Sequence, residues 1–212
     1  MKVLELFSGT GSIGKAFPND EVISVDMDKR FKPTHLISIF DFDYKQYEHF
    51  DYIHASPPCQ YFSGLQTTWY NRMKRVNGEM VMYNKDIHLK MVEEVSDKLV
   101  LKAFEIIEYF KPKYWSMENP YSNKKLSLVN RPYMKDYDYT IADYCMYDYP
   151  LKKPTIFFNN FNLELKRCDK SHTHTKWGDF EGGGGNPYER YKIPSLLCEN
   201  IRERIISVFI FS

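Results

Sequence analysis

Short apolar runs alternate with helical stretches along the first half of the chain, and this alternation limits the possible folds more than any other feature. Predicted strands lie at 3–7, 22–25, 51–55, 114–117, 139–144 and 154–158. Apolar residues recur at helical spacing over 92–110, where we expect a helix that stops before Pro112. A second helix is expected over 194–206, with a proline in its first turn. The pattern predicts an α/β protein with a mostly parallel sheet covered by helices.

Length and composition indicate one globular domain over 1–212, because 212 residues with 43% hydrophobic content can bury a large core. The net charge of +1 does not by itself indicate a nucleic-acid partner, so any such partner must bind to a local basic patch. Four scattered cysteines favour a reducing compartment. The apolar run at 205–211 is far shorter than the roughly 20 residues that cross a bilayer. With no secretory signal at the N-terminus, we expect an intracellular, non-secreted protein that does not associate with membranes.

A glycine-rich segment at 7–14, with the sequence Phe-Ser-Gly-Thr-Gly-Ser-Ile-Gly, follows the first predicted strand. Its glycines allow a tight turn and a close approach of a cofactor to the backbone. Asp26 ends the second strand, where its carboxylate is placed to accept hydrogen bonds from ribose hydroxyls. The pattern fits a dinucleotide site, a nucleoside loop of S-adenosylmethionine-dependent enzymes, or an ordinary tight turn.

Two further strand ends carry reactive side chains. The third strand ends in Ser-Pro-Pro-Cys-Gln at 56–60, and the fourth in Met-Glu-Asn-Pro at 117–120. Open α/β sheets hold their ligands at the carboxyl ends of the strands, so Cys59 and Glu118 are expected at one edge. A thiol there is a candidate nucleophile if its pKa is lowered, whereas a buried structural cysteine is the alternative.

These three motifs, in this order and at these strand ends, resemble the DNA cytosine-C5 methyltransferases, particularly compact members from phages and large DNA viruses. The resemblance covers most of 1–160 and implies a Rossmann-like S-adenosylmethionine-dependent methyltransferase fold. It implies that a Cys59 thiolate attacks C6 of a flipped-out cytosine while Glu118 contacts N3 and the exocyclic amine. Covalent addition at C6 is needed because C5 is a poor nucleophile, and the base must leave the stack to be reached.

The resemblance also implies two sets of site residues. The catalytic candidates are Cys59, Glu118, Asn119, Lys152 and Lys153. The candidates for binding S-adenosylmethionine are Phe7, Ser8, Gly9, Thr10, Gly11, Asp26, Met27, Ser38, Ile39 and Pro57. The two lysines are included among the catalytic candidates because residues 149–156 lack the Arg-x-Arg element usual in the family, and lysines are the only cations there. Residues 191–195 likewise replace its usual Gly-Asn-Ala/Ser-Val-Pro element.

Two basic stretches are candidates for contacting double-stranded DNA. The stretch 66–92 carries five basic and two acidic residues and is predicted to be a phosphate-facing loop. Family members have a separate target-recognition domain, and the stretch 161–190 is predicted to be a much reduced version of it. Four glycines at 182–185 indicate a hinge. Both stretches could instead be solvated loops. We expect a short target of a few base pairs.

Cys168, His172 and His174 could contribute to a zinc site, but four ligands at convincing spacing are not evident, so no metal is expected. We expect a monomer, and the sequence does not reveal whether a restriction or accessory partner exists. Methylation of cytosine in RNA and a catalytically silent binding module are alternative functions. A nicotinamide-dependent dehydrogenase is the weakest alternative, because it leaves the Pro-Pro-Cys and Glu-Asn-Pro motifs unexplained.

Overall fold

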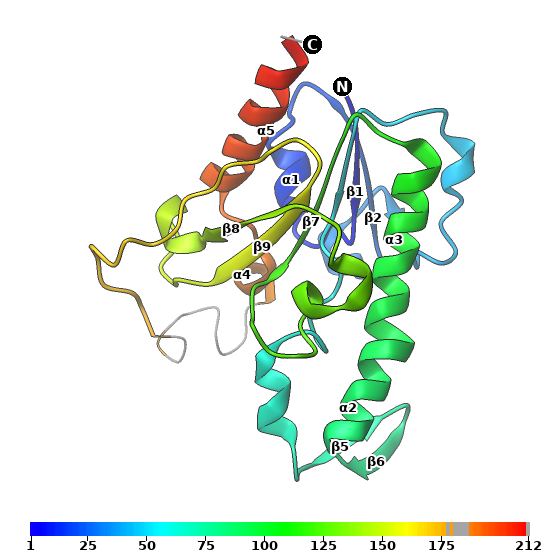
Figure 1. The fold of residues 1–212 in the computed structure, drawn as a ribbon. Helices are drawn as coiled ribbons and strands as arrows, with labels where there is room; N and C mark the ends of the chain where they lie inside the picture. Colours follow the sequence, from blue (N-terminus) through cyan, green and yellow to red (C-terminus); the bar gives the residue numbers. More distant parts are fainter. Residues whose placement is uncertain (177–178, 180–186, 211–212) are drawn as a thin grey trace.

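The computed structural model describes residues 1–176, 179 and 187–210 and contains a mixed seven-stranded sheet (Figure 1). The strand order is β3 (His35–Leu36), β2 (Glu21–Asp26), β1 (Lys2–Leu6), β4 (Tyr52–Ala55), β7 (Tyr114–Pro120), β9 (Pro154–Asn159) and β8 (Tyr139–Asp143). The first five strands in this order are parallel, and β9 runs antiparallel between β7 and β8. The six predicted strands and the mostly parallel sheet are therefore confirmed, whereas the two-residue strand β3 was not predicted.

Helices cover both faces of the sheet. Helix α3 (Asp97–Phe110) lies on one face, and α1 (Ser12–Lys15) and α5 (Ser195–Ile210) lie on the other (Figure 1). Val3 and Leu4 of the central strand β1 are both fully buried, but they belong to different hydrophobic clusters. Successive strand residues point to opposite faces, so this continuous apolar run is what a sheet covered on both sides requires. Among the described helices, none is both long and apolar enough to cross a membrane.

The helix predicted over 92–110 is more complex than expected. Helix α2 (Lys85–Met91) precedes it, and Val92–Ser96 form a π-helical turn before α3 begins. Helix α3 ends as predicted before Pro112, with Lys111 in the left-handed conformation at φ 44°. The helix predicted over 194–206 is confirmed as α5, which is one residue later at its start and extends to Ile210.

The prediction of a loop over 66–92 is wrong. Strands β5 (Met73–Val76) and β6 (Glu79–Met82) form an antiparallel hairpin beyond the lower end of α3 in Figure 1, followed by α2. Asn77 and Gly78 connect the strands with φ values of 51° and 90°. An Asn-Gly pair with two positive φ values is the preferred two-residue hairpin turn, because its twist matches that of the strands.

The strand order places the point where the chain changes direction between β1 and β4. From β1 the chain continues to β2 and β3 on one side, and from β4 it continues to β7 on the other. The segments that leave the carboxyl ends of β1 and β4 therefore diverge, and ligands of open α/β sheets bind in such a crevice. Short 3-10 turns and the helix α4 (Pro187–Tyr191) complete the described elements, while the predicted hinge at 182–185 lies outside the described residues.

Gly14 of α1 lies too close to β2 for any side chain. A Cβ atom at Gly14 would lie 2.9 Å from Val22 Cγ1 and 3.0 Å from Glu5 Oε2. We expect Gly14→Ala to lower the free energy of unfolding by about 1–3 kcal/mol, because the packed layer must shift. Chemical denaturation measures this loss.

The matched control for this prediction is a double-mutant cycle with Val22→Ala, which removes the methyl groups that a Cβ atom at position 14 would meet. The two substitutions should destabilise less together than the sum of their separate effects. Strict additivity, or an unchanged stability in Gly14→Ala, would contradict the assigned contact.

Candidate active site

The glycine-rich segment forms a strained turn at the carboxyl end of β1. Phe7, Gly9 and Gly11 have φ values of 55°, 47° and 66°, so Phe7 belongs to the turn and not to the predicted strand. The Gly9 N–H donates to Asp26 Oδ2 and the Asp28 N–H donates to Asp26 Oδ1, both at 2.7 Å. Asp26 therefore braces the turn, while each of its oxygens retains a lone pair for a further donor.

Glu5 supports the same turn from below and is not among the residues predicted from sequence. Its carboxylate is buried and accepts the N–H groups of Ile13 at 3.0 Å and Gly14 at 3.1 Å. Burial raises the pKa of Glu5 to about 7, against the lowering effect of these two N–H donors. An acidic residue among the buried apolar residues of β1 is the sequence signal that marks it, since isolated buried carboxylates are rare.

A cleft of about 330 Å³ opens beside the turn, within the size range of small-molecule sites. Its lining includes Ser8, Gly9, Thr10 and Gly11 together with 30–33, which follow β2. The other predicted cofactor residues are outside this lining, at or just after the ends of β1 to β4. Among them, Met27 is 72% exposed and Ser38 is half-buried, whereas Ile39 and Pro57 are buried.

A buried hydrogen bond joins the two strand ends that carry the predicted nucleophile and acid. Asn119 is fully buried, and its Nδ2 donates to the Pro57 carbonyl at 2.9 Å. Pro57 lies two residues before Cys59, and Asn119 directly follows Glu118. The contact therefore makes Asn119 a positioning residue, which holds the Cys59 turn against the end of β7.

Cys59, Glu118 and Lys153 share one electrostatic environment. Burial raises the pKa of Cys59, the Glu118 carboxylate raises it further, and Lys153 and Arg190 lower it. Burial also raises the pKa of Glu118, with Lys153 acting in the opposite direction. The pKa of Lys153 is lowered by burial against the attraction of Glu118 and Cys59. Lys152 is half-exposed and is not among the charges that shift the pKa of Cys59 or Glu118, so the fold brings only one of the two predicted lysines to this site.

Tyr144 and Arg190 complete this site without having been predicted for it. Tyr144 donates from its hydroxyl to Glu118 Oε1 at 3.1 Å, and its ring lies 4.7 Å from Lys153 Nζ. Lys153 Nζ donates to the Arg190 carbonyl at 3.1 Å. The sequence offers no local signal for Arg190 as a site residue, because it lies at the end of the predicted recognition region and meets Lys153 only in the folded chain. Tyr144 was predicted only as a strand end, and it instead begins the turn after β8.

The described parts of the two predicted DNA-contacting stretches differ in character. The β5–β6 hairpin exposes the side chains of Met73, Met80 and Met82 by 50%, 54% and 54%. Lys74 Nζ lies 4.5 Å from the centre of the Trp69 ring at the base of this hairpin. In the second stretch, the Arg167 side chain forms an ion pair with buried Asp143 at 2.8 Å, which ties this predicted contact residue to the sheet.

Comparison with known proteins places the chain in a family. The family model described as C-5 cytosine-specific DNA methylase matches residues 1–125. A Frog virus 3 (isolate Goorha) protein named "Probable DNA (cytosine-5)-methyltransferase" is 30% identical over 162 residues, which cover 73% of this chain and 68% of the viral protein. The chain therefore belongs to the C-5 cytosine-specific DNA methylase family, as the sequence motifs predicted.

Two solved structures resemble this chain, and one of them supports the fold assignment. The Entamoeba histolytica methyltransferase EhMeth matches with a TM-score of 0.52 and 18% identity, over 84% of this chain and 58% of that chain. The S. pombe Dnmt2 methyltransferase matches with a TM-score of 0.48 and 15% identity, again over 84% and 58%. The likeness to EhMeth confirms the Rossmann-like methyltransferase fold. The chain spans less than two thirds of the length of these two solved chains.

The neighbouring lysines allow a direct test of the site's electrostatics. Lys153→Met removes a cation that favours the Cys59 thiolate, so we expect it to raise the pKa of Cys59 further. Lys152→Met is the matched control and should leave the pKa of Cys59 unchanged. The measurement is the pH dependence of Cys59 alkylation by iodoacetamide, followed by peptide mass spectrometry. Equal effects of the two substitutions would contradict the placement of Lys153.

Proposed function

We propose that this protein methylates C5 of cytosine in double-stranded DNA, with S-adenosylmethionine as the methyl donor. The observation that carries this proposal is the grouping of Cys59, Glu118 and Lys153 at the sheet edge that also carries the glycine-rich turn. A thiol and a carboxyl group with a nearby cation are the groups required for covalent addition to a pyrimidine ring. Membership of the C-5 cytosine-specific DNA methylase family supports the same reaction.

The raised pKa of Glu118 suits the first step of this reaction, because it favours a protonated carboxyl group, whereas the raised pKa of Cys59 means that the thiolate needs stabilisation by nearby cations. The Cys59 thiolate forms a bond to C6 of the cytosine, while Glu118 delivers a proton to N3, so that the ring becomes an enamine. A proton held on Glu118 also removes the negative charge that opposes thiolate formation. Lys153 and Arg190 then stabilise the thiolate, because they lower the pKa of Cys59.

The second step transfers the methyl group and releases the protein. The enamine carbon C5 takes the methyl group that S-adenosylmethionine supplies when bound. Loss of the C5 proton to a base then allows the bond between Cys59 Sγ and C6 to break, and the N3 proton returns to the Glu118 carboxylate, which restores the thiolate, the protonated acid and the aromatic ring. Tyr144 holds Glu118 in place during these steps by the hydrogen bond that its hydroxyl donates to Oε1.

The proposed cofactor fits the residues around the glycine-rich turn. Gly9 and Gly11 present bare backbone beside the cleft, where a ligand can approach closely. Asp26 retains acceptor capacity for ribose hydroxyls, and the exposed apolar side chain of Met27 offers a surface for an adenine ring. This arrangement supports Asp26 and Met27 as cofactor-binding residues.

DNA contacts are proposed for the β5–β6 hairpin and the described part of 161–190. Met73, Met80 and Met82 expose apolar surface beside basic residues, a combination suited to wedging into a base stack and contacting phosphates. Each base-edge contact discriminates by only about 1–3 kcal/mol, so two small elements favour a short target. We expect the protein to act as a monomer on intracellular DNA.

Calorimetry tests the cofactor assignment. S-adenosylmethionine and its demethylated product should bind the wild-type protein, and NAD should not compete. Asp26→Asn should weaken binding by about tenfold or more, because a charged acceptor is lost and the turn loses its brace. Asp43→Asn, at an exposed position after β3, serves as the control and should bind normally. Binding of NAD without any response to S-adenosylmethionine would refute the assignment.

An oligonucleotide containing 5-fluorocytosine tests the covalent step. Fluorine at C5 blocks the final elimination, so the wild-type protein should remain attached to duplex DNA and appear as an adduct by intact mass spectrometry. Cys59→Ala should form no adduct, whereas Cys198→Ala, which alters a buried cysteine of α5, should form one. Adduct formation by Cys59→Ala would overturn the nucleophile assignment, and reaction with RNA alone would overturn the DNA substrate.

A further inference from the structure

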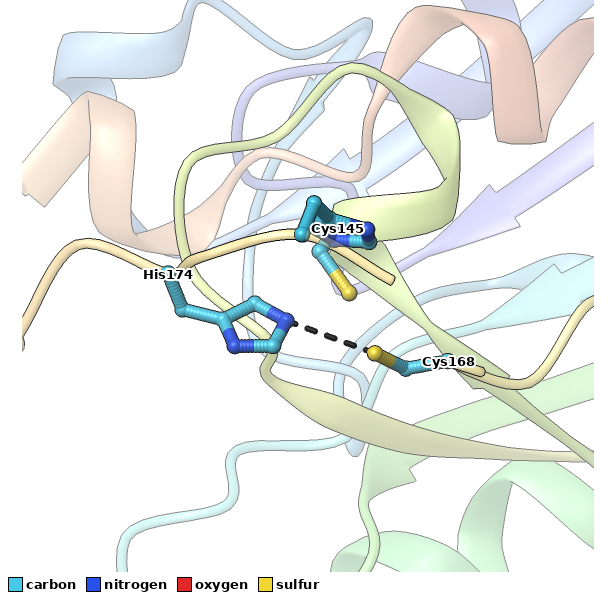
Figure 2. A group of neighbouring side chains, drawn as sticks. Cys145, Cys168 and His174 are labelled. Atoms are coloured by element: carbon cyan, nitrogen blue, oxygen red, sulfur yellow. Dashed lines mark hydrogen bonds between the residues drawn. The ribbon is translucent and has the colours of Figure 1, made fainter. Parts of the chain in front are cut away.

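Four potential metal ligands meet at the edge of the sheet beside β8, outside the candidate active site. They are Cys145, Cys168, His172 and His174, and their ligand atoms all lie within 4.8 Å of one another. Cys145 belongs to the turn Tyr144–Tyr147 that follows β8, and the other three belong to the segment that follows β9. Figure 2 shows the side chains of Cys145, Cys168 and His174 pointing toward a common centre.

We propose that these four residues bind a structural Zn²⁺ ion. Two thiolates and two neutral imidazoles are a tetrahedral donor set that zinc favours, and the two thiolates balance its charge. Zn–S bonds of about 2.3 Å and Zn–N bonds of about 2.0–2.1 Å place tetrahedral ligand atoms roughly 3.3–3.8 Å apart. Cys168 Sγ lies 3.4 Å from His174 Nε2, within this range. No separation in the cluster exceeds this range by more than about 1 Å, which small side-chain rotations can close.

The fourth ligand accounts for the difference from the sequence-based expectation of no metal. Cys168, His172 and His174 are close in sequence, but Cys145 precedes them by a full strand and its connections. Strand β8 pairs with β9, and the chain then passes back along the outer edge of β8, where the Asp143 N–H donates to the Lys166 carbonyl at 3.0 Å. Tertiary structure therefore supplies the ligand that spacing alone did not reveal.

Buried Asp143 holds the two cysteine-bearing segments together. Its Oδ2 accepts the Cys168 N–H and the Arg167 Nε–H, both at 2.8 Å. Asp143 lies two residues before Cys145, so one carboxylate fixes Cys168 relative to Cys145. The Lys166 N–H also donates to the Tyr147 hydroxyl at 2.7 Å, on the other side of Cys145. Such support around the ligands is what a preorganised metal site requires.

The backbone around Cys168 also helps to position its sulfur. The Lys170 N–H donates to Cys168 Sγ at 3.3 Å. At the other end of the segment, the Thr175 N–H donates to the Pro150 carbonyl at 3.0 Å. Lys153 of the candidate active site follows Pro150 by three residues. The metal would therefore tie the described part of the recognition region to the connection before β9 that carries Lys153.

Four protein ligands leave no open coordination position, so the ion stabilises structure and takes no part in methyl transfer. This inference is independent of the proposed function: a protein with no methyltransferase activity would still bind the metal. A bound ion should stabilise the folded chain, because the unfolded chain lacks the preformed site.

Metal analysis of the full chain, purified under reducing conditions and reconstituted with zinc chloride, tests the proposal. We expect about one zinc per chain, and Co²⁺ in its place should give the thiolate charge-transfer and ligand-field absorption of a tetrahedral Cys2His2 site. Each of Cys145→Ser, Cys168→Ser, His172→Asn and His174→Asn should lose this absorption. Cys59→Ser and His49→Asn are the matched controls and should keep about one equivalent of metal.

Three results would overturn the proposal. The first is that the wild-type chain binds neither zinc nor cobalt, a result that does not depend on whether any variant folds. The second is that the four ligand variants keep the same metal content as the controls, which would assign the metal to another location. The third is that the cobalt spectrum lacks thiolate charge transfer, which would exclude the cysteines as ligands.

Discussion

The hydrogen bond between Asn119 Nδ2 and the Pro57 carbonyl connects the two halves of the candidate active site. Parallel pairing of β4 with β7 aligns Ala55, the last residue of β4, with Met117, while β7 continues to Pro120. The chain then turns toward Cys59 on one strand and continues to Glu118 on the other. Without the amide of Asn119, the Pro57 carbonyl would lose a buried donor at a cost of about 1–3 kcal/mol. The position of the nucleophile relative to the acid depends on this contact.

The positive charge at the site comes from separate segments of the chain. Lys153 follows the turn after β8 and Arg190 lies in α4, and both lower the pKa of Cys59. Lysine is a point charge without the planar fork of arginine, so it stabilises a thiolate without fixing a partner in two directions. The bond from Lys153 Nζ to the Arg190 carbonyl links these cations. Any movement of the chain around α4 is therefore expected to alter the reactivity of Cys59.

The sequence was sufficient for features that depend on local pattern. Apolar runs located the main strands, and motifs at their ends located Cys59, Glu118 and the glycine-rich turn. Contacts between distant segments could not be predicted from the sequence. Tyr144 follows β8, Lys153 precedes β9 and Arg190 lies in α4, and only the fold brings them together. The same holds for Cys145 and Cys168. The β5–β6 hairpin is a different case, because its Asn77-Gly78 turn is a local signal that predicts a hairpin and the basic charge of the stretch obscured it.

The product of the reaction tests the central claim most directly. The wild-type protein would be incubated with duplex DNA and S-adenosylmethionine carrying a deuterated methyl group, and the DNA would be digested to nucleosides for mass spectrometry. Our account predicts labelled 5-methyl-2′-deoxycytidine with the wild-type protein and none with Cys59→Ala. Label on the exocyclic nitrogen of cytosine, label on adenine, or equal label with Cys59→Ala would contradict it.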